Sequence, residues 1–575
     1  MATVPRLSAA LLWISPALVL LGMHGRVAAQ QLPLAVGVSE EERQKIEAAI
    51  PEAALVTPAK RRQLLIFDLN VGYGGHRSIA HANLAFTLLG QRTGAFQTVI
   101  ARDPAVFQPR SLERFDAVLF NNTVGNLFED SALRRSLIDF VYSGGGLLGL
   151  HGTTVAFTRW PGAHEDWPEF GVMLGARGAN HRASDEQVFI KLDDPDHPLT
   201  RCFDRGGFDY RDEFFRVHEP YSRDRVRVLL SIDTAKTDFN QGEARGKALR
   251  ADNDYALAWV RSYGRGRVFY CTIAHNPYVF WDPRMLNFYL AAVQFATGDL
   301  LAPTAPSSRL SPATRAEEKL GWRLGGTVSR VNPPPLFEAI DKAAQLGLSY
   351  LGGLSWQKVS GDLPQEFDHQ LTPDQLERIR LKLDSAGVRL LTYSVRQLPT
   401  EEPACCRIFE FARRMGVEAL ICEQWPGLLE RVEKHCDQFD LRLAIPADDW
   451  TASSGDGRPE RLAEALRGRS QRIGVYGDVG AWLRSGIEPV AVLRTLGERL
   501  VALGIHDVHP PVSKGREVPW GAQAVQLERL LAEIRRFGLQ PTIFGLGLPI
   551  DDASSMPEAV QCIEFFRRAS RKLAE

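Results

Sequence analysis

The chain has 575 residues, of which 45% are hydrophobic and 24% are charged, so it is long enough for two or more domains and is not mainly disordered. Lys and Arg number 68 and Asp and Glu 69, which gives a net charge of −1 and disfavours proteins that wrap a nucleic acid. Seven cysteines without a Cys-x-x-Cys pair exclude a zinc ribbon and a thioredoxin-like motif. We therefore expect a large protein that acts on small or neutral partners and binds no nucleic acid.

The first 29 residues have the pattern of a secretory signal peptide. Arg6 precedes the apolar run LSAALLWISPALVLLGM, and small residues lead up to Ala29. We expect cleavage after about Ala29 and export to the periplasm or the extracellular space. An uncleaved membrane anchor is the alternative, which the short run and its Pro16 disfavour. No later segment is apolar enough to predict a stable membrane span.

Strands and helices alternate over residues 60–300. Buried parallel strands are predicted at QLLIFDL, FQTVIARD, FDAVLFNN and GGLLGLHG, with helices at about 78–95 and 130–143 between them. A β-rich stretch follows, comprising EQVFIKL, VRVLLSI and a hairpin around Gly264-Arg265-Gly266, and a helix at about 283–297 ends the region. This order predicts a doubly wound α/β domain, whose ligands lie beyond the carboxyl ends of the strands.

Residues 301–317 have the Pro-, Ser- and Thr-rich composition of a linker, and a more regular region follows at 318–575. Its helices end in glycine plus an aliphatic residue, as at Gly387-Val388, directly before the next strand. Eight strands are predicted: GWRLGGTV, YLGGLSW, RLLTYSV, EALICEQ, RLAIPA, IGVYGDV, VALGIHDV and PTIFGLG. Eight strands alternating with helices indicate a (β/α)8 TIM barrel, with a pair of smaller α/β domains as the alternative.

The first region resembles the ThuA-like (trehalose utilisation) family. The motifs that carry the resemblance are GYGGHRS, FDAVLFNNTVG, GGGLLGLHG, LGARGANH, DYRDEFF and GRGRVFYCTIAHNP, in this order. The family implies a flavodoxin-like doubly wound sheet of the class I glutamine-amidotransferase type. In the amidotransferases a nucleophilic cysteine follows the central strand, but this chain has His151 there. Glutamine hydrolysis by a thiol is therefore not expected.

Histidines are concentrated in the first region and follow its strands. The candidate catalytic residues are His76, His151, His181, Asp212, Glu213 and His275. Imidazoles with carboxylates are suited to acid–base chemistry near neutral pH or to a divalent metal. The absence of HxH and HExxH spacing favours the acid–base interpretation. For any single histidine the alternative is a polar turn residue, which we expect of His81, His164 and His197.

The second region resembles the xylose-isomerase-like barrels of sugar phosphate isomerases and epimerases, most clearly at GVYGDVGAWLRSGIEPVAVLRTLGERL. The resemblance implies a divalent metal held by carboxylates and histidines at the strand ends. Most of those positions hold other residues here, namely Pro446, Ala447, Ala481, Gly504, Phe544 and Gly545. Glu423 and Asp478 remain as possible metal ligands, with His506 and His509 near them in the sequence. We therefore expect this barrel to be inactive as an isomerase.

Four tryptophans in strand-to-helix segments of the barrel are candidates for sugar binding: Trp425, Trp450, Trp482 and Trp520. Aromatic rings stack on the apolar faces of sugars, but packing of the barrel rim explains such residues equally well.

Three hypotheses of function follow. The first is an exported enzyme that isomerises an oxidised (keto) sugar or cleaves a glycoside by acid–base chemistry in the ThuA-like domain. The second is a non-catalytic pair of saccharide-binding modules. The third gives the barrel a structural role, as in a homo-oligomer. In each case a small carbohydrate is the expected partner, and the sequence does not decide whether a divalent metal is the cofactor.

Overall fold

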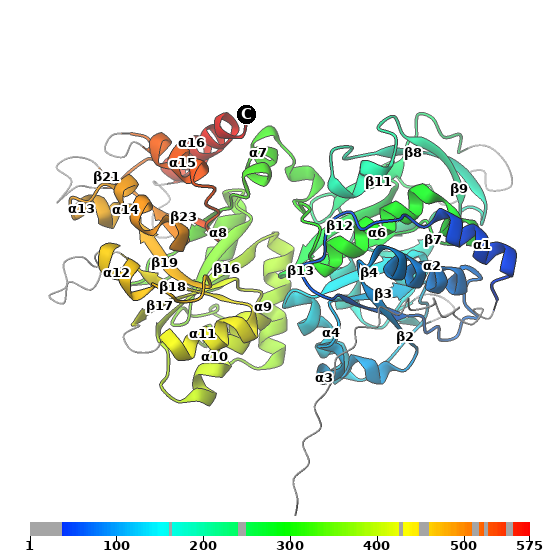
Figure 1. Cartoon of the computed structure of the whole chain (residues 1–575), viewed down its shortest axis with the longest axis horizontal. Coiled ribbons are helices and arrows are strands. Elements are labelled where there is room, and N and C mark those ends of the chain that lie inside the picture. Colours follow the sequence, from blue (N-terminus) through cyan, green and yellow to red (C-terminus); the bar gives the residue numbers. More distant parts are fainter. Residues whose placement is uncertain are drawn as a thin grey trace, which may run out of the picture.

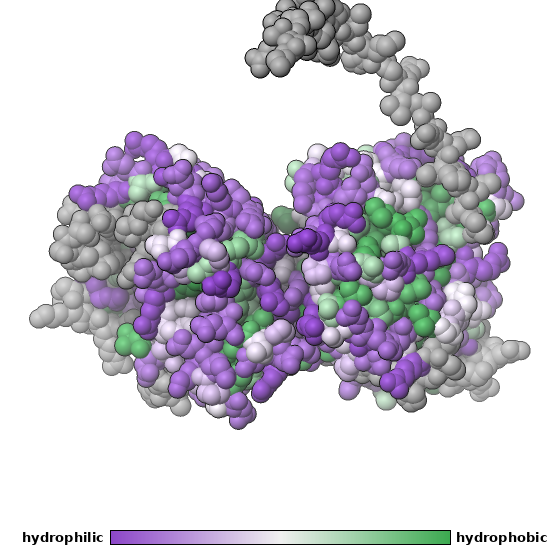
Figure 2. All heavy atoms as spheres, turned by 90° about the horizontal axis from the view of Figure 1, so that it is seen from below, coloured by the Kyte–Doolittle hydropathy of each residue, from purple (hydrophilic) through white to green (hydrophobic). Residues whose placement is uncertain are grey.

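The computed structural model describes residues 37–159, 164–239, 249–424, 429–447, 459–508, 517–522, 527–547 and 556–575. The chain forms two lobes, one built on an open sheet and the other on a closed barrel (Figure 1), and a waist separates them in the space-filling view (Figure 2). The segment predicted to be a signal peptide lies outside the described residues. Among the described helices, none has the length and apolar character needed to cross a membrane.

The first lobe is built on a nine-stranded sheet. In spatial order its strands are β2 (Gln97–Ala101), β1 (Gln63–Phe67), β3 (Ala117–Asn121), β4 (Gly146–Leu150), β13 (Gly266–Cys271), β12 (Ala256–Tyr263), β11 (Arg227–Ile232), β8 (Glu186–Leu192) and β9 (Phe208–Asp212). The strands from β2 to β13 are parallel, and their order is that of a flavodoxin-like sheet. The four strands from β12 to β9 extend the sheet in antiparallel fashion. The predicted doubly wound α/β fold is confirmed.

Helices cover both faces of this sheet. They are α1 (Glu40–Ala49), α2 (Ser78–Thr93), α3 (Pro109–Leu112), α4 (Ser131–Tyr142), α5 (Pro168–Leu174) and α6 (Pro283–Thr297). Successive residues of β1 point to opposite faces, so Ile66 packs in the core formed with α2 and α6, and Phe67 packs in the core formed with α4 and α5. Asp130 caps α4 as predicted, because its carboxylate accepts the backbone N–H of Ala132 at 2.7 Å.

The second lobe is a closed barrel of eight parallel strands, which confirms the predicted (β/α)8 fold. In order around the barrel the strands are β14 (Leu324–Thr327), β15 (Tyr350–Leu354), β16 (Arg389–Gln397), β17 (Ala419–Gln424), β18 (Arg442–Pro446), β19 (Ile473–Asp478), β20 (Leu500–Ile505) and β23 (Phe544–Gly547). The helices outside them are α8 (Leu336–Gln345), α9 (Pro373–Ala386), α10 (Glu402–Arg414), α11 (Leu429–Phe439), α12 (Pro459–Ala465), α13 (Val479–Arg484), α14 (Pro489–Leu496), α15 (Leu527–Arg536) and α16 (Met556–Ala574). Gly387 ends α9 in the left-handed conformation that the glycine pattern predicts, with φ +63°.

The segment predicted to be a linker, 301–317, is partly helical. The helix α7 (Pro312–Leu320) begins inside it, capped by Ser311, and packs against α16 at the end of the chain. The Pro- and Ser-rich composition therefore describes only the start of the connection, and α7 belongs to the barrel lobe.

Ion pairs join the two lobes along α9 and α4. Asp384 on α9 accepts from Arg225, at 2.7 Å, and from Arg261, both of the first lobe. Asp139 on α4 pairs with Arg380 on α9 at 2.6 Å and with Arg414 on α10 at 3.1 Å. Because the Asp384 and Arg261 side chains are only 7% and 4% exposed, this contact is part of a buried interface.

We expect Glu169, on α5 at this interface, to make the protein less stable as the pH rises. Burial, reinforced by the negative charge of Glu377 on α9, raises the pKa of Glu169 from 4.5 to about 7. The stability that the protonated group contributes is fully present below the unfolded pKa and is lost as the pH rises through the folded pKa. Between about pH 5 and pH 8 the wild type should lose about 3 kcal/mol relative to Glu169→Gln. Urea unfolding of both proteins across this range measures the difference, and parallel pH profiles would contradict the assignment.

Candidate metal centre

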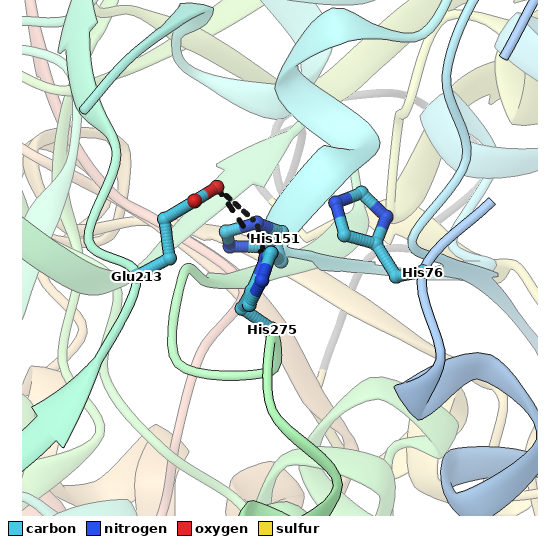
Figure 3. Close-up of side chains that lie close together, drawn as sticks. All are labelled: His76, His151, Glu213 and His275. Carbon is cyan, nitrogen blue, oxygen red and sulfur yellow. Dashed lines mark hydrogen bonds and ion pairs between the residues drawn. The ribbon is translucent and has the colours of Figure 1, made fainter. Parts of the chain in front are cut away.

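Four side chains from separate loops meet at the carboxyl edge of the first sheet. His76 follows β1, His151 follows β4, His275 follows β13, and Glu213 follows the edge strand β9. Their potential ligand atoms all lie within 4.8 Å of one another, and Figure 3 shows the side chains pointing toward a common centre. The parallel order of β1, β4 and β13 explains the convergence, because the carboxyl ends of parallel strands meet at one edge.

His151 occupies the tight turn after the central strand β4. Its φ of +40° lies in the left-handed region, which is uncommon for residues other than glycine and is concentrated at functional sites. Its Nδ1 lies 2.8 Å from the carbonyl oxygen of Thr272, and the ring of Phe215 packs on the imidazole at 3.9 Å between centroids. Since a carbonyl only accepts, Nδ1 carries the proton and Nε2 presents its lone pair to the cluster. A histidine that ligates a metal is commonly oriented in this way.

Three ligand atoms form a nearly equilateral triangle. His151 Nε2 lies 3.3 Å from Glu213 Oε1 and 3.3 Å from His275 Nδ1, and the third side, His275 Nδ1 to Glu213 Oε1, is 3.4 Å. In a tetrahedral site with bonds of about 2.0–2.1 Å, ligand atoms are about 3.3–3.4 Å apart. Octahedral coordination at about 2.1 Å would bring neighbouring ligands to about 3.0 Å. The triangle therefore has the dimensions of one face of a tetrahedral site, such as that of zinc.

His76 completes the cluster from the opposite side. Its Nδ1 is buried without a hydrogen-bond partner, while its Nε2 lies 3.4 Å from the hydroxyl of Tyr73. Burial, together with the charges of the other imidazoles, lowers the pKa of His76 to about 2. Burial and the charge of His151 lower the pKa of His275 to about 4. Both rings are therefore neutral at pH 7, the form in which imidazole binds a metal.

Three ligands with a further position for water or substrate are typical of catalytic zinc, whereas structural sites are closed by four. Glu213, His151 and His275 supply three ligands at the separations that a tetrahedral ion needs. His76 can act either as a fourth ligand or as a neutral group beside an open position.

Glu213 also connects the cluster to solvent through His181. Its Oε2 lies 3.2 Å from His181 Nδ1, and the His181 side chain is 43% exposed. Burial opposes the ionisation of Glu213, but its contacts with His151, His275 and His181 outweigh burial and lower its pKa. The carboxylate therefore stays ionised, and His181 is the outermost titratable group of the site.

Asp212 was also predicted to be catalytic, and in the structure it bonds to the loop that carries His275. Its carboxylate accepts the backbone N–H groups of His275 and Asn276 at 3.2 and 3.0 Å and the side-chain amide of Asn276 at 2.7 Å. Burial raises the pKa of Asp212 to about 7. With these bonds the side chain positions the loop that carries His275.

Sequence patterns did not identify two further residues of the site, Tyr73 and Thr272. Tyr73 lies three residues before His76 in the GYGGHRS motif, and this short separation could have indicated that the two side chains are neighbours. Thr272 orients His151 through its backbone carbonyl. Every residue has such a carbonyl, so the residue type at position 272 could not have predicted this contact.

The candidate ligands of the barrel do not form a comparable cluster. Glu423 is exposed and lies 3.7 Å from Arg330. Asp478 caps α13 by accepting the N–H of Ala481 at 2.9 Å, and it lies 4.0 Å from His506. Among the described residues, three or more potential ligands converge only at the histidine cluster of the first lobe.

The barrel tryptophans differ in what they can bind. The prediction for Trp482 is wrong, because its side chain is fully buried and its indole N–H donates to the carbonyl of Ala447 at 2.7 Å, so no ring face is open to a sugar. Trp520 is 6% exposed and lines a cavity of about 620 Å³ at the carboxyl ends of the barrel strands, together with Asp478 and His506. Trp425, Trp450 and His509 lie outside the described residues.

Comparison with known proteins supports the resemblance of the first lobe. Residues 63–296 match the family model for trehalose utilisation (ThuA), which confirms that resemblance. A search of curated proteins gave no match.

Several solved structures are similar to about two fifths of this chain. A ThuA-like protein from Bacteroides uniformis is 21% identical with a TM-score of 0.35, over 42% of this chain and 94% of that one. A sugar phosphate isomerase/epimerase from Parabacteroides distasonis is 11% identical with a TM-score of 0.31, over 40% of this chain and 87% of that one. A 3-keto-D-glucoside 4-epimerase from E. coli is also 11% identical with a TM-score of 0.31, over 43% and 99%. At these scores the similarities identify no activity.

Proposed function

We propose that this protein is a carbohydrate-processing enzyme in which His151, Glu213 and His275 hold a divalent metal ion. The observation that carries the proposal is the triangle of 3.3, 3.3 and 3.4 Å between their ligand atoms. The match of residues 63–296 to the trehalose utilisation family supports a carbohydrate substrate. This proposal revises the preference for metal-free acid–base chemistry that the sequence favoured.

The substrate class that suits such a site is an oxidised (keto) sugar or its glycoside. A bound divalent ion would polarise a sugar carbonyl and lower the pKa of an adjacent hydroxyl or water. The neutral ring of His76 lines the same centre, and the phenol of Tyr73 lies next to it. His181 is placed to pass a proton between substrate and solvent, because it is bonded to Glu213 and is partly exposed. Both isomerisation and glycoside cleavage need such a proton transfer.

Metal removal and reconstitution test this function. The full chain, dialysed against a chelator and then against buffer or Zn²⁺, is incubated with 3-keto-glucosides, and the products are followed by mass spectrometry. We expect one tightly held ion per chain and turnover that depends on it. Absence of turnover in the Zn²⁺-loaded protein, or equal turnover before and after chelation, would overturn the proposal.

A non-catalytic saccharide-binding role is the second candidate, favoured by the barrel cavity of about 620 Å³ with Trp520 in its wall. It predicts saturable sugar binding without chemical change, and the same mass spectra distinguish the two functions.

We also propose that the protein is exported and loses residues 1–29. Amino-terminal sequencing of the protein recovered from its native compartment tests this, and an intact Met1 in an exported fraction would contradict it.

A further inference from the structure

A shallow groove lies next to the loops that carry the metal cluster. Its volume is about 540 Å³, and it is lined by Gln187, Asp209, Tyr210, Arg211, Tyr278, Trp281 and Asp282. Arg211 is two residues before Glu213, and Tyr278 is three residues after His275. These chain separations limit the Cα–Cα distances to about 7 Å and about 11 Å.

Two aromatic side chains form one wall of this groove. Tyr278 and Trp281 belong to the 3-10 helix η4 (Pro277–Trp281), and both are partly exposed. A 3-10 helix has three residues per turn, so side chains three positions apart lie on the same side of the helix. The Tyr278 hydroxyl donates to the backbone carbonyl of Arg211 at 2.8 Å, which fixes the ring over the edge strand. The two rings therefore lie on the same side of η4.

Polar side chains of the edge strands form the other wall. Gln187 on β8 pairs in register with Arg211 on β9, and the alternation of β9 turns Asp209 to the same exposed face. The charges are largely compensated, because Arg211 lies 3.6 Å from Asp185 and Asp282 lies 2.8 Å from Arg284. A groove with aromatic faces, amide and carboxylate groups and little net charge suits a neutral ligand rich in hydroxyl groups.

The groove and the cluster are held in fixed relation by Asp212. Its carboxylate, at the end of β9, accepts the backbone N–H of His275 and the backbone and side-chain N–H groups of Asn276. Asn276 is the residue directly before η4. One buried side chain therefore ties the strand that carries Arg211 to the loop that carries His275. A ligand in contact with both the groove and the cluster would bind to a preorganised surface.

We propose that this groove binds a second sugar ring, so that the substrate is a neutral disaccharide or glycoside and not a free monosaccharide. The inference rests on the proposed function and specifies its substrate class. One ring contacts the metal cluster, and the ring attached to it stacks on Tyr278 and Trp281 while its hydroxyl groups bond to Gln187 and Asp209.

Binding and turnover are measured separately to test the groove. Isothermal titration calorimetry of the full chain with trehalose, cellobiose and glucose measures affinity, and 3-keto derivatives of the same sugars measure kcat and KM. Trp281→Ala should raise the Kd and KM for the disaccharides about 10-fold and leave kcat and the values for the monosaccharides within about twofold. Gln187→Ala, at an exposed strand position, should raise the disaccharide KM about threefold without affecting the fold.

Matched variants keep the outcomes distinct. Phe537→Ala removes another exposed aromatic ring, 40% exposed on the barrel lobe, and should change none of these values. Trp281 also contacts Lys45 and His81, so the melting temperature of each variant is compared with that of the wild type. Two results would contradict sugar binding in the groove even if turnover occurs. One is equal affinity for glucose and for every disaccharide, and the other is an unchanged disaccharide KM in both Trp281→Ala and Gln187→Ala. Disaccharide binding that is weakened in Trp281→Ala and retained in His151→Ala supports the groove even if no turnover is found.

Discussion

Replacing His151 by alanine should reduce the metal content of the chain from about one ion to nearly none and lower turnover more than 100-fold. Changing a residue that only orients a ligand typically lowers metal affinity or activity about 10–100-fold, and loss of the ligand itself should exceed that. His151 is fully buried, and its Nε2 takes part in two of the three ligand separations, so its removal leaves only one side of the triangle. Elemental analysis after dialysis and turnover assays on the same preparation measure both effects.

Two further variants separate metal binding from folding. Asparagine tolerates the left-handed backbone at position 151 better than alanine, so His151→Asn should lose the metal with little loss of stability. His218→Ala removes an exposed histidine from the strand β10 (Arg216–His218) of the same lobe and should retain the ion. Full metal content in both His151 variants would show that the cluster is not the binding site.

The position of the cluster follows from the sequence, but its chemistry does not. His76, His151 and His275 each come after a buried strand, and parallel strands bring such residues to one edge of a sheet. Motifs such as HxH and HExxH record ligands on one helix or hairpin, whereas these potential ligands come from four separate segments. The proton on Nδ1 of His151 depends on the Thr272 carbonyl, and only the folded backbone places that group.

The same distinction explains why neighbouring residues in the sequence point to different surroundings. Trp482 does lie in a strand-to-helix segment, as its sequence position indicates, yet its indole turns inward to the carbonyl of Ala447. Asp212 and Glu213 are adjacent, and alternation along the chain points them in different directions, one to the His275 loop and one to the cluster. Patterns of strands and helices predict which segments meet, while the direction of one side chain depends on contacts between distant residues.

Replacing Asp384 by alanine should lower the free energy of unfolding by about 3–5 kcal/mol. Its carboxylate is the common partner of Arg225 and Arg261, and the Arg261 side chain is 4% exposed. Removing one partner of a buried pair leaves an uncompensated charge, which accounts for a loss of this size. Urea unfolding followed by both fluorescence and circular dichroism measures it.

Asp440→Asn is the matched control at the same interface, because asparagine tolerates the left-handed backbone at this position (φ +52°) better than alanine does. Asp440 pairs with Arg265 at 2.6 Å and with Arg472 at 2.9 Å, but its side chain is 63% exposed, so removing its charge should change stability by less than about 1 kcal/mol. If the two variants lose the same free energy of unfolding, burial does not determine how much these ion pairs contribute to stability. If Asp384→Ala also separates unfolding into two transitions while Asp440→Asn keeps one, the buried pair is what makes the sheet and the barrel unfold together. In that case the barrel contributes to the proposed metal site by stabilising the lobe that holds it, whether or not its own cavity binds a sugar.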